Sequence, residues 1–352
     1  MLATRFNGPF DITVEQVPDP RPVDPTDATV EILYSAICGS DLWTYRGIVP
    51  HAPGGIGHEF MGRVLDVGAG VTSVRPGDTV IAPFAFSEGH CDQCRRGLQP
   101  LCEDSGIWGK DWAGAQAQAI RVPFADATLV PLPWSAGELD TELARLLMPL
   151  CDVYATGTHG AVLAGVGAGD TVVVIGDGAV GISAAHAARR MGAGRVVLLG
   201  EQPARLTVAK GFDVETLRVS RDESPVARVR ELFGGRLPDR VVECVGAQAA
   251  FDTALEVVAP GGAVGYVGVP HGVEPIPPMR LFARQVTLCG GVAPARRYLP
   301  GLIDEVRSGS LDPSALIDRT LALADAPKGY AAMDTGTALK VLLETTGGSH
   351  GD

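Results

Sequence analysis

The segment Gly176-Asp177-Gly178-Ala179-Val180-Gly181 decides the fold of this chain. An apolar run at residues 171–175 precedes it, an Ala-rich helical pattern at 180–191 follows it, and a second apolar run covers 195–199. Apolar runs of this length are typical of buried parallel strands. In that setting the three glycines permit a tight turn, the approach of a pyrophosphate and close packing of helix on strand, which predicts a dinucleotide site.

The alternation of strands and helices continues beyond this unit. Further apolar runs lie at residues 240–245, 262–267 and 285–288. Strands that alternate with helices imply a doubly wound parallel sheet. The alternative for the glycine segment, a tight turn without a ligand, is disfavoured by this context.

The chain before residue 150 follows a different pattern. It is rich in glycine and proline, and turn sequences separate its β-branched runs at 29–33, 62–67 and 78–82. Short strands at this spacing predict an irregular β-barrel or sandwich. Toward the C-terminus the sequence predicts an amphipathic helix at 300–308 and a strand at 338–343.

Length and charge restrict the possible classes of protein. The 352 residues are enough for two domains. The formal net charge of −12 disfavours nucleic acid or an anionic membrane surface as a partner, because both would repel the chain. There is no run of about 18 apolar residues and no signal-peptide pattern, so neither a membrane span nor secretion is expected.

The cysteines point to metal binding rather than to disulfides. The seven are Cys38, Cys91, Cys94, Cys102, Cys151, Cys244 and Cys289. Their number is odd and three of them lie within twelve positions, which fits metal ligation in a reducing compartment. The cytoplasm is therefore the expected location.

The cysteine-rich segment at 88–102 predicts a structural zinc site. Cys91, Cys94 and Cys102 form C-x2-C followed by a third cysteine after seven residues. Glu88 lies three residues before Cys91 and continues the spacing, whereas His90 is adjacent to that cysteine and sterically less suited. Glu88 is therefore favoured as fourth ligand, with His90 as the competitor. The alternative is a loop of reduced thiols without metal.

A second possible metal site combines Cys38, in C-G-S-D, with His58, in G-H-E. A thiolate and a neutral imidazole are good zinc ligands, and catalytic zinc takes about three protein ligands and an open position. A cysteine and a histidine so far apart are otherwise often core residues. Asp41 and Glu59, however, are polar neighbours for a core.

The residues after the second strand bear on the choice between NAD and NADP. A carboxylate there binds the ribose hydroxyls and repels a 2′-phosphate. Gly200 leaves room for a phosphate, whereas Glu201 disfavours one. Arg205 could pair with a phosphate or with Glu201, or be a solvated helix residue. The balance gives a slight preference for NAD.

These motifs resemble the zinc-containing medium-chain dehydrogenase/reductase family, especially its bacterial alcohol, threonine and polyol dehydrogenase branches. The resemblance extends over nearly the whole chain. It implies a GroES-like catalytic domain made from both chain ends, residues 1–153 and 292–352, and an inserted Rossmann domain at 154–291. It also implies a homodimer or a homotetramer.

The resemblance assigns roles to individual residues near the metal. Cys38, His58 and Asp152 would bind catalytic zinc, while Cys151, one place from Asp152, is expected to pack. Glu59 would join the metal transiently. Ser40 would contact the substrate oxygen.

The same resemblance implies the cofactor site. Lys340 would lie near the pyrophosphate, and Val267 and Val269 beside the nicotinamide. The full set of expected cofactor-binding residues is Gly176, Gly178, Ala179, Val180, Gly181, Gly200, Glu201, Arg205, Val245, Val267, Val269 and Lys340.

One position departs from the family pattern. Many relatives carry a proton-relay histidine five residues after the catalytic cysteine, where this chain has Trp43, which cannot relay a proton. Trp43 and Trp108 are expected in the substrate pocket, with ordinary aromatic packing as the alternative. His51 could act as the relay or be a simple loop histidine.

The expected activity is reversible hydride transfer between an alcohol, or its aldehyde or ketone, and NAD or NADP. Zinc would polarise the substrate oxygen, and Ser40 would pass the proton toward solvent. The alternatives are a zinc-free reductase acting on an activated double bond and a non-catalytic protein that binds zinc and nucleotide. The substrate, the direction of reaction and the resting coordination of Glu59 are left open by the sequence.

Overall fold

The computed structural model describes residues 1–220 and 224–345. The chain divides into two compact units, Met1–Asp152 with Pro294–Asp352, and Val153–Ala293. Among the described residues, no helix combines the length and the apolar character that crossing a bilayer requires.

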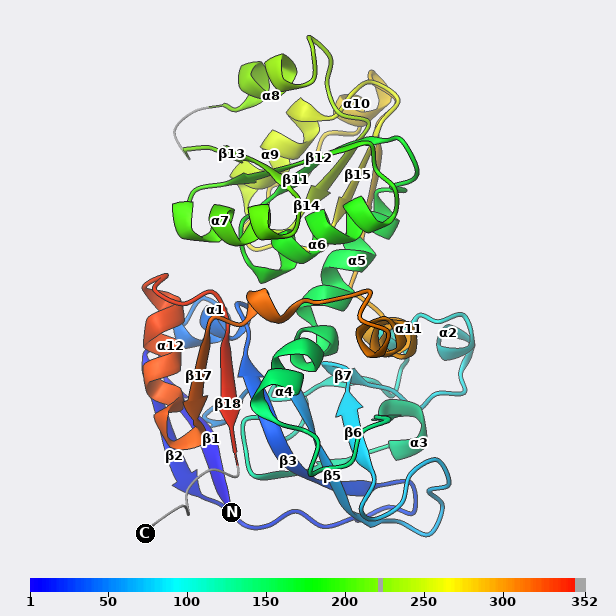
Figure 1. Ribbon diagram of the computed structural model, residues 1–352, viewed down its shortest axis with the longest axis vertical. Helices are drawn as coiled ribbons and strands as arrows, with labels where there is room; N and C mark the ends of the chain where they lie inside the picture. Colours follow the sequence, from blue (N-terminus) through cyan, green and yellow to red (C-terminus); the bar gives the residue numbers. More distant parts are fainter. Residues whose placement is uncertain (221–223, 346–352) are drawn as a thin grey trace. The chain divides into compact units, whose positions relative to one another are not determined.

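The unit Val153–Ala293 contains a parallel sheet with the strand order β13–β12–β11–β14–β15–β16 (Figure 1). Its strands are β11 (Thr171–Ile175), β12 (Arg195–Gly200), β13 (Glu215–Arg218), β14 (Arg240–Glu243), β15 (Ala263–Tyr266) and β16 (Thr287–Gly290). Its helices are α5 (Val153–Leu163), α6 (Ala179–Arg190), α7 (Pro203–Gly211), α8 (Val226–Leu232), α9 (Gln248–Val257) and α10 (Pro278–Phe282). The sheet runs outward from β11 in both directions, which confirms the predicted doubly wound fold.

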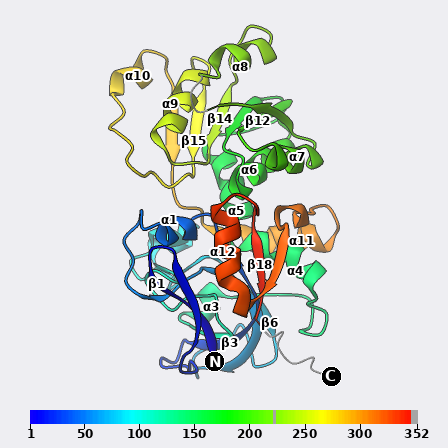
Figure 2. The same ribbon diagram turned by 90° about the vertical axis from the view of Figure 1, so that its left-hand side faces the viewer.

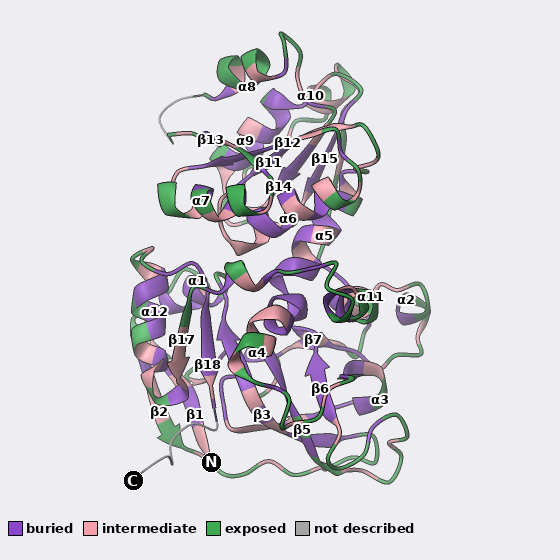
Figure 3. Cartoon of the chain, in the orientation of Figure 1, coloured by how far each residue is buried: buried purple, intermediate pink, exposed green. Residues whose placement is uncertain are grey.

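The central strands are buried because helices pack on the sheet. Figure 3 shows β11, β12 and β14 almost entirely in the buried class. Val173, Val197, Val241 and Val264 meet in one hydrophobic cluster. Strands covered on both faces read as continuous apolar runs, so the sequence pattern and the burial agree.

The other unit is built mainly from β-strands. Its principal sheet has the order β10–β6–β5–β3–β18–β17, with β9 also paired to β3; a second sheet is β2–β1–β4, and β7 pairs with β8. The strands are β1 (Leu2–Gly8), β2 (Asp11–Gln16), β3 (Ala28–Ile37), β4 (Gly54–Gly55), β5 (Glu59–Val67), β6 (Thr79–Ala82), β7 (Ala85–Phe86), β8 (Gly106–Ile107), β9 (Ala119–Val122), β10 (Val130–Pro131), β17 (Arg319–Ala322) and β18 (Val341–Glu344).

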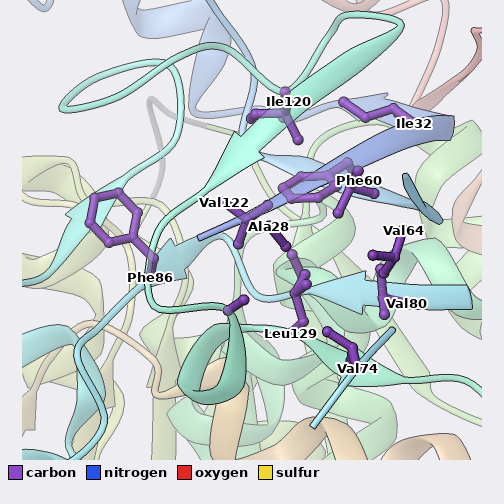
Figure 4. Packing of buried hydrophobic residues seen from close by; sticks show 14 of the residues in the cluster. Ala28, Ile32, Phe60, Val64, Val74, Val80, Phe86, Ile120, Val122 and Leu129 are labelled. Carbon is purple, nitrogen blue, oxygen red and sulfur yellow. The ribbon is translucent and has the colours of Figure 1, made fainter. Parts of the chain in front are cut away.

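Both ends of the chain contribute to the principal sheet. Strand β18 pairs antiparallel with β3 and parallel with β17, so C-terminal strands join the N-terminal ones (Figure 2). This confirms the predicted GroES-like domain made from both chain ends. Apolar side chains on β3, β5 and β6, among them Ile32, Phe60 and Val80, form its core (Figure 4).

Short helices connect these strands. They are α1 (Asp41–Tyr45), α2 (Asp92–Arg95), α3 (Ala125–Thr128), α4 (Thr141–Leu147), α11 (Ala295–Arg307), α12 (Ala326–Asp334) and the 3₁₀ turns η1 (Gln99–Leu101), η2 (Met148–Cys151), η3 (Ser314–Leu316) and η4 (Leu323–Asp325). Helix α11 begins before Pro300, earlier than predicted. Pro300 lies inside this helix, where it has no N–H to donate to the carbonyl four residues earlier.

Candidate zinc and dinucleotide sites

Pairing of strands β3 and β5 brings the first group of metal-ligand residues together. Cys38 follows the last residue of β3, and His58 precedes the first residue of β5. The strands are antiparallel with Ala36 opposite Glu59, so the end of one lies beside the start of the other. Asp152 follows η2 and completes the group.

The side chains of this group point at one another. Cys38 Sγ lies 3.2 Å and His58 Nε2 lies 3.1 Å from Asp152 Oδ2. The ligand atoms of Cys38, His58, Glu59 and Asp152 all lie within 4.8 Å of one another, and all four residues are buried. Cys151 stands outside the group, and its thiol donates to the carbonyl of Phe60.

The electrostatics of this group fit a bound cation. Burial raises the pKa of the Cys38 thiol, and the nearby Asp152 carboxylate raises it further. Burial works to lower the pKa of His58, but Asp41 and Asp152 outweigh it and hold that pKa well above its usual range. Without a metal, the protons on Cys38 and His58 thus compensate the charge of the nearby carboxylates. A divalent cation can replace these protons. A thiolate, an imidazole and carboxylates are the donors that zinc takes in catalytic sites.

Asp41 holds two of these residues in place. Its Oδ1 lies 3.2 Å from His58 Nδ1, and its Oδ2 accepts a hydrogen bond from the Cys38 backbone N–H at 2.9 Å. Gln116 Nε2 also donates to Oδ2, at 3.3 Å. A carboxylate on the far nitrogen of a ligand histidine fixes the ring orientation and tautomer. The sequence indicated Asp41 only as a polar neighbour; its place three residues after Cys38 was the available signal.

Lys340 lies beside the same group. Its Nζ donates to Glu59 Oε1 at 2.5 Å and to the Ile37 carbonyl at 3.5 Å, and the side chain is 1% exposed. Burial works to lower the pKa of Lys340, but Glu59 outweighs it and the pKa is raised. Glu59 Oε2 is buried and has no hydrogen-bond partner among residues 1–220 and 224–345. The contact of Lys340 with a pyrophosphate stays a prediction.

Three other residues expected near the substrate, Ser40, Trp43 and His51, differ in their exposure and contacts. Ser40 is exposed, with its Oγ 3.5 Å from His58 Nε2, and Trp43 on α1 is half-buried. Both ring nitrogens of His51 face backbone carbonyls, those of Ala52 and Gly109.

Trp108 packs in the core. It is 1% exposed, its ring lies edge-on to Phe60 at 5.3 Å, and its indole N–H donates to the Pro83 carbonyl at 2.8 Å. The sequence allowed two interpretations of Trp108, a place in the substrate pocket or aromatic packing. These contacts agree with aromatic packing. Trp43 is then the remaining candidate for the substrate pocket.

The second group of metal-ligand residues lies in the loop that carries α2 and η1. The ligand atoms of Glu88, Cys91, Cys94 and Cys102 lie within 4.8 Å of one another. Burial raises the pKa of the Cys102 thiol to about 12, so this thiol stays protonated unless a cation replaces the proton. His90 is 82% exposed and lies outside the group, paired with Glu88.

The glycine segment fits a dinucleotide. Gly176 has a φ of +111°, and a Cβ at Gly181 would lie 1.8 Å from the Gly176 carbonyl oxygen, so both positions need glycine. A Cβ at Gly178 would meet nothing within 4 Å, which leaves open space beside the start of α6. Within the described part of the chain, no side chain caps the start of this helix. Its first N–H groups are therefore suited to a phosphate.

The remaining residues expected at the cofactor lie after the strands of the parallel sheet. Gly200 ends β12, Val245 follows β14, and Val267 and Val269 follow β15. Carboxyl ends of parallel strands lie at one edge of a sheet, where ligands bind in such folds. Arg205 lies on α7, which follows β12.

Comparison with known proteins agrees with this architecture. The profile "Alcohol dehydrogenase GroES-like domain" matches residues 24–133, and "Zinc-binding dehydrogenase" matches residues 179–308. Zinc-type alcohol dehydrogenase B of Aspergillus flavus is 32% identical over 98% of this chain and 81% of its own length.

Solved structures are similar over almost the full chain. The alcohol dehydrogenase TADH from Thermus sp. ATN1 is 35% identical, with a TM-score of 0.90 over 98% of this chain and 99% of its own. A zinc-binding dehydrogenase from Sinorhizobium meliloti 1021, bound to NADP, is 27% identical, with a TM-score of 0.82 over 98% and 99%.

The chain belongs to the zinc-binding medium-chain alcohol dehydrogenase family. It is a zinc-type, NAD(P)-dependent alcohol dehydrogenase, which confirms the predicted enzyme class and cofactors. A zinc-free reductase and a non-catalytic protein, the two alternatives that the sequence allowed, are thereby set aside.

Proposed function

We propose that the enzyme interconverts an alcohol and its aldehyde or ketone at a zinc ion held by Cys38, His58 and Asp152. The observation that carries this proposal is the buried convergence of a thiol, an imidazole and a carboxylate within 4.8 Å. Residues 1–153 and 292–352 would form the catalytic domain. Residues 154–291 would bind the dinucleotide through the glycine segment and the carboxyl ends of the strands.

The chemistry divides between the cofactors and the chain. When bound, zinc supplies a Lewis acid for the substrate oxygen, and the nicotinamide supplies the hydride acceptor or donor. Asp41 orients His58, as the 3.2 Å contact to Nδ1 indicates. Ser40 Oγ accepts the proton of the substrate hydroxyl as it donates its own proton to water, which it can reach because the residue is exposed.

Ser40 is the better proton route on geometric grounds. Trp43 has no group that exchanges protons at neutral pH, and His51 directs its nitrogens at backbone carbonyls. We assign Trp43 to the substrate pocket, which makes it a determinant of which alcohols are accepted. Glu59, beside the metal ligands, is held by Lys340 at 2.5 Å. This contact favours a resting state in which Glu59 does not bind the metal.

We assign a structural zinc to Glu88, Cys91, Cys94 and Cys102. The support is local: the loop offers few apolar residues, and its Cys102 thiol, whose pKa burial raises, needs a cation to ionise. His90 is not a ligand in this assignment, since its side chain faces solvent.

Two measurements test the function. Activity is assayed with a panel of alcohols and aldehydes, with NAD and NADP in parallel, and zinc is counted by elemental analysis. We expect oxidation of at least one alcohol class and about two zinc ions per chain. A chain that binds zinc and nucleotide but oxidises none of the panel would contradict the proposal.

We propose further that the enzyme is a cytoplasmic homodimer joined through β16. This strand ends the parallel sheet, and Thr287, Cys289 and Gly290 on it are exposed. Phe282 on the preceding helix is also exposed. An exposed edge strand with apolar neighbours can pair with its own copy. Light scattering gives the subunit number, and a monomeric mass would contradict the dimer.

The proposed cytoplasmic location rests on the cysteines. All seven cysteines are free, as expected in a reducing compartment.

A further inference from the structure

Strand β12 ends without the carboxylate that is common at this position in NAD-binding Rossmann sheets. Rossmann sheets that bind NAD commonly place a carboxylate about 20 residues after the glycine segment, where it accepts hydrogen bonds from the adenosine ribose. Here β12 ends at Gly200. The relatives do not decide the matter, because one solved structure of the family is bound to NADP.

The carboxylate of Asp177 lies against Gly200. A Cβ placed on Gly200 would be 2.5 Å from Asp177 Cβ and 2.7 Å from Asp177 Oδ2. The Asp177 side chain thus occupies the space that a side chain of residue 200 would need. The two positions are complementary: an aspartate within the glycine segment requires a glycine at the end of β12.

Backbone hydrogen bonds fix this carboxylate. Asp177 Oδ2 accepts from the N–H groups of Glu201 and Gln202, at 2.8 and 2.7 Å. Among the described residues, Oδ1 has only Arg205 Nη1, at 3.9 Å. The side chain is 12% exposed. One oxygen is therefore engaged in holding the loop, and the other can still accept a strong hydrogen bond.

We propose that Asp177 selects NAD over NADP by presenting its carboxylate to the adenosine ribose hydroxyls at the end of β12. The carboxylate accepts hydrogen bonds from the 2′-hydroxyl and repels a 2′-phosphate. This inference rests on the proposed function, in which residues 154–291 bind the dinucleotide. Asp177, a residue of the glycine segment, thus recognises the adenosine ribose, which Gly200 cannot do because it has no side chain.

Two other roles for these residues give different results. Arg205 could turn to a 2′-phosphate, in which case the enzyme would prefer NADP. Asp177 could only brace the loop after β12, in which case its charge would not affect cofactor choice. Asparagine can still accept the two backbone hydrogen bonds, so Asp177→Asn separates bracing from charge.

The test is a direct binding titration of NADH and NADPH, followed by nucleotide fluorescence in the absence of substrate. We expect the unsubstituted enzyme to bind NADH at least about tenfold more tightly, the usual size of a charged hydrogen bond. Asp177→Asn should bring the two dissociation constants together. The control Asp213→Asn removes an exposed carboxylate paired with Arg189 in the same unit and should leave their ratio unchanged.

A double variant tests the complementarity. Asp177→Gly with Gly200→Asp moves the carboxylate to the usual position and removes the Cβ that would collide with it. We expect this variant to regain the preference for NADH. Gly200→Asp alone should bind both nucleotides poorly, since Asp177 occupies the same space.

Each outcome has one meaning. An unchanged ratio in Asp177→Asn would overturn the inference and leave bracing as the role. Preference for NADPH in the unsubstituted enzyme, lost in Arg205→Ala, would also overturn it. Absence of binding for both nucleotides would contradict the proposed function itself, a result distinct from equal binding of the two.

Discussion

The two groups of metal-ligand residues are built in opposite ways. Glu88 and Cys102 are 14 positions apart, and one loop supplies the whole group. Cys38 and Asp152 are 114 positions apart, and two paired strands and a 3₁₀ turn must be in place before they meet. We therefore expect the loop to depend on a bound metal for its order, and the buried site to depend on the fold.

Because of this difference, we expect the loop group to affect mainly stability and the buried group to affect mainly catalysis. Metal loss from the buried site leaves a sheet whose core does not include the ligands. Metal loss from the loop removes what holds a segment with few apolar contacts. Substitutions in the two groups should therefore affect different measurements.

The largest effect is expected from Cys38→Ala. Loss of the catalytic metal should lower kcat/KM by about a thousandfold or more, because several kcal/mol of transition-state stabilisation are lost. Zinc content should fall by one ion per chain, with little change in thermal unfolding. Normal turnover in this variant would show that the buried group is not the catalytic centre.

Cys94→Ser should have the opposite profile. Loss of the loop zinc is expected to lower the free energy of unfolding by about 4 kcal/mol and to expose residues 88–102 to proteolysis. Activity at low temperature should largely remain. Asp92→Asn, which changes an exposed side chain of the same loop outside both groups, is the matched control. Equal loss of stability in Cys38→Ala and Cys94→Ser would remove the distinction between the groups.

Asp41→Asn should produce an intermediate effect at the buried site. Removing the charge behind a ligand histidine usually weakens metal binding by about 10–100-fold. Competition with a chromogenic chelator measures that affinity, and excess zinc should restore turnover. Asp66→Asn, an exposed carboxylate on β5, serves as control. Zinc affinity unchanged by Asp41→Asn would mean that the contact with His58 Nδ1 plays no part in metal binding.

The contrast between the groups also explains what the sequence could predict. The loop ligands share a short segment, so their spacing alone indicated a zinc site. The sequence indicated the pairing of Cys38 with His58 less strongly, because these residues are far apart in the sequence and their contact follows from the β3–β5 register. Asp152 likewise came from the resemblance.

Contacts between residues that lie far apart in the sequence were not predicted. The Lys340–Glu59 pair joins β18 to β5 across β3, and nothing in either local sequence indicates it. The sequence indicates no role for Asp177, because its relation to Gly200 depends on how the loop after β12 turns. The strands and the doubly wound order, by contrast, follow from local apolar patterns.

The smallest effect is expected at His90, where the choice of the fourth loop ligand can be decided. His90 and Glu88 are two residues apart and paired, yet only Glu88 lies within ligand distance of the three cysteines. His90→Ala should therefore leave the zinc content and the melting temperature almost unchanged, because the His90 side chain is 82% exposed and a contact from such a side chain contributes little. Glu88→Ala should weaken zinc binding and destabilise the loop as Cys94→Ser does, while Glu88→Cys should retain the metal. Zinc loss in His90→Ala with full retention in Glu88→Ala would reverse the assignment, and elemental analysis with thermal unfolding distinguishes the two results.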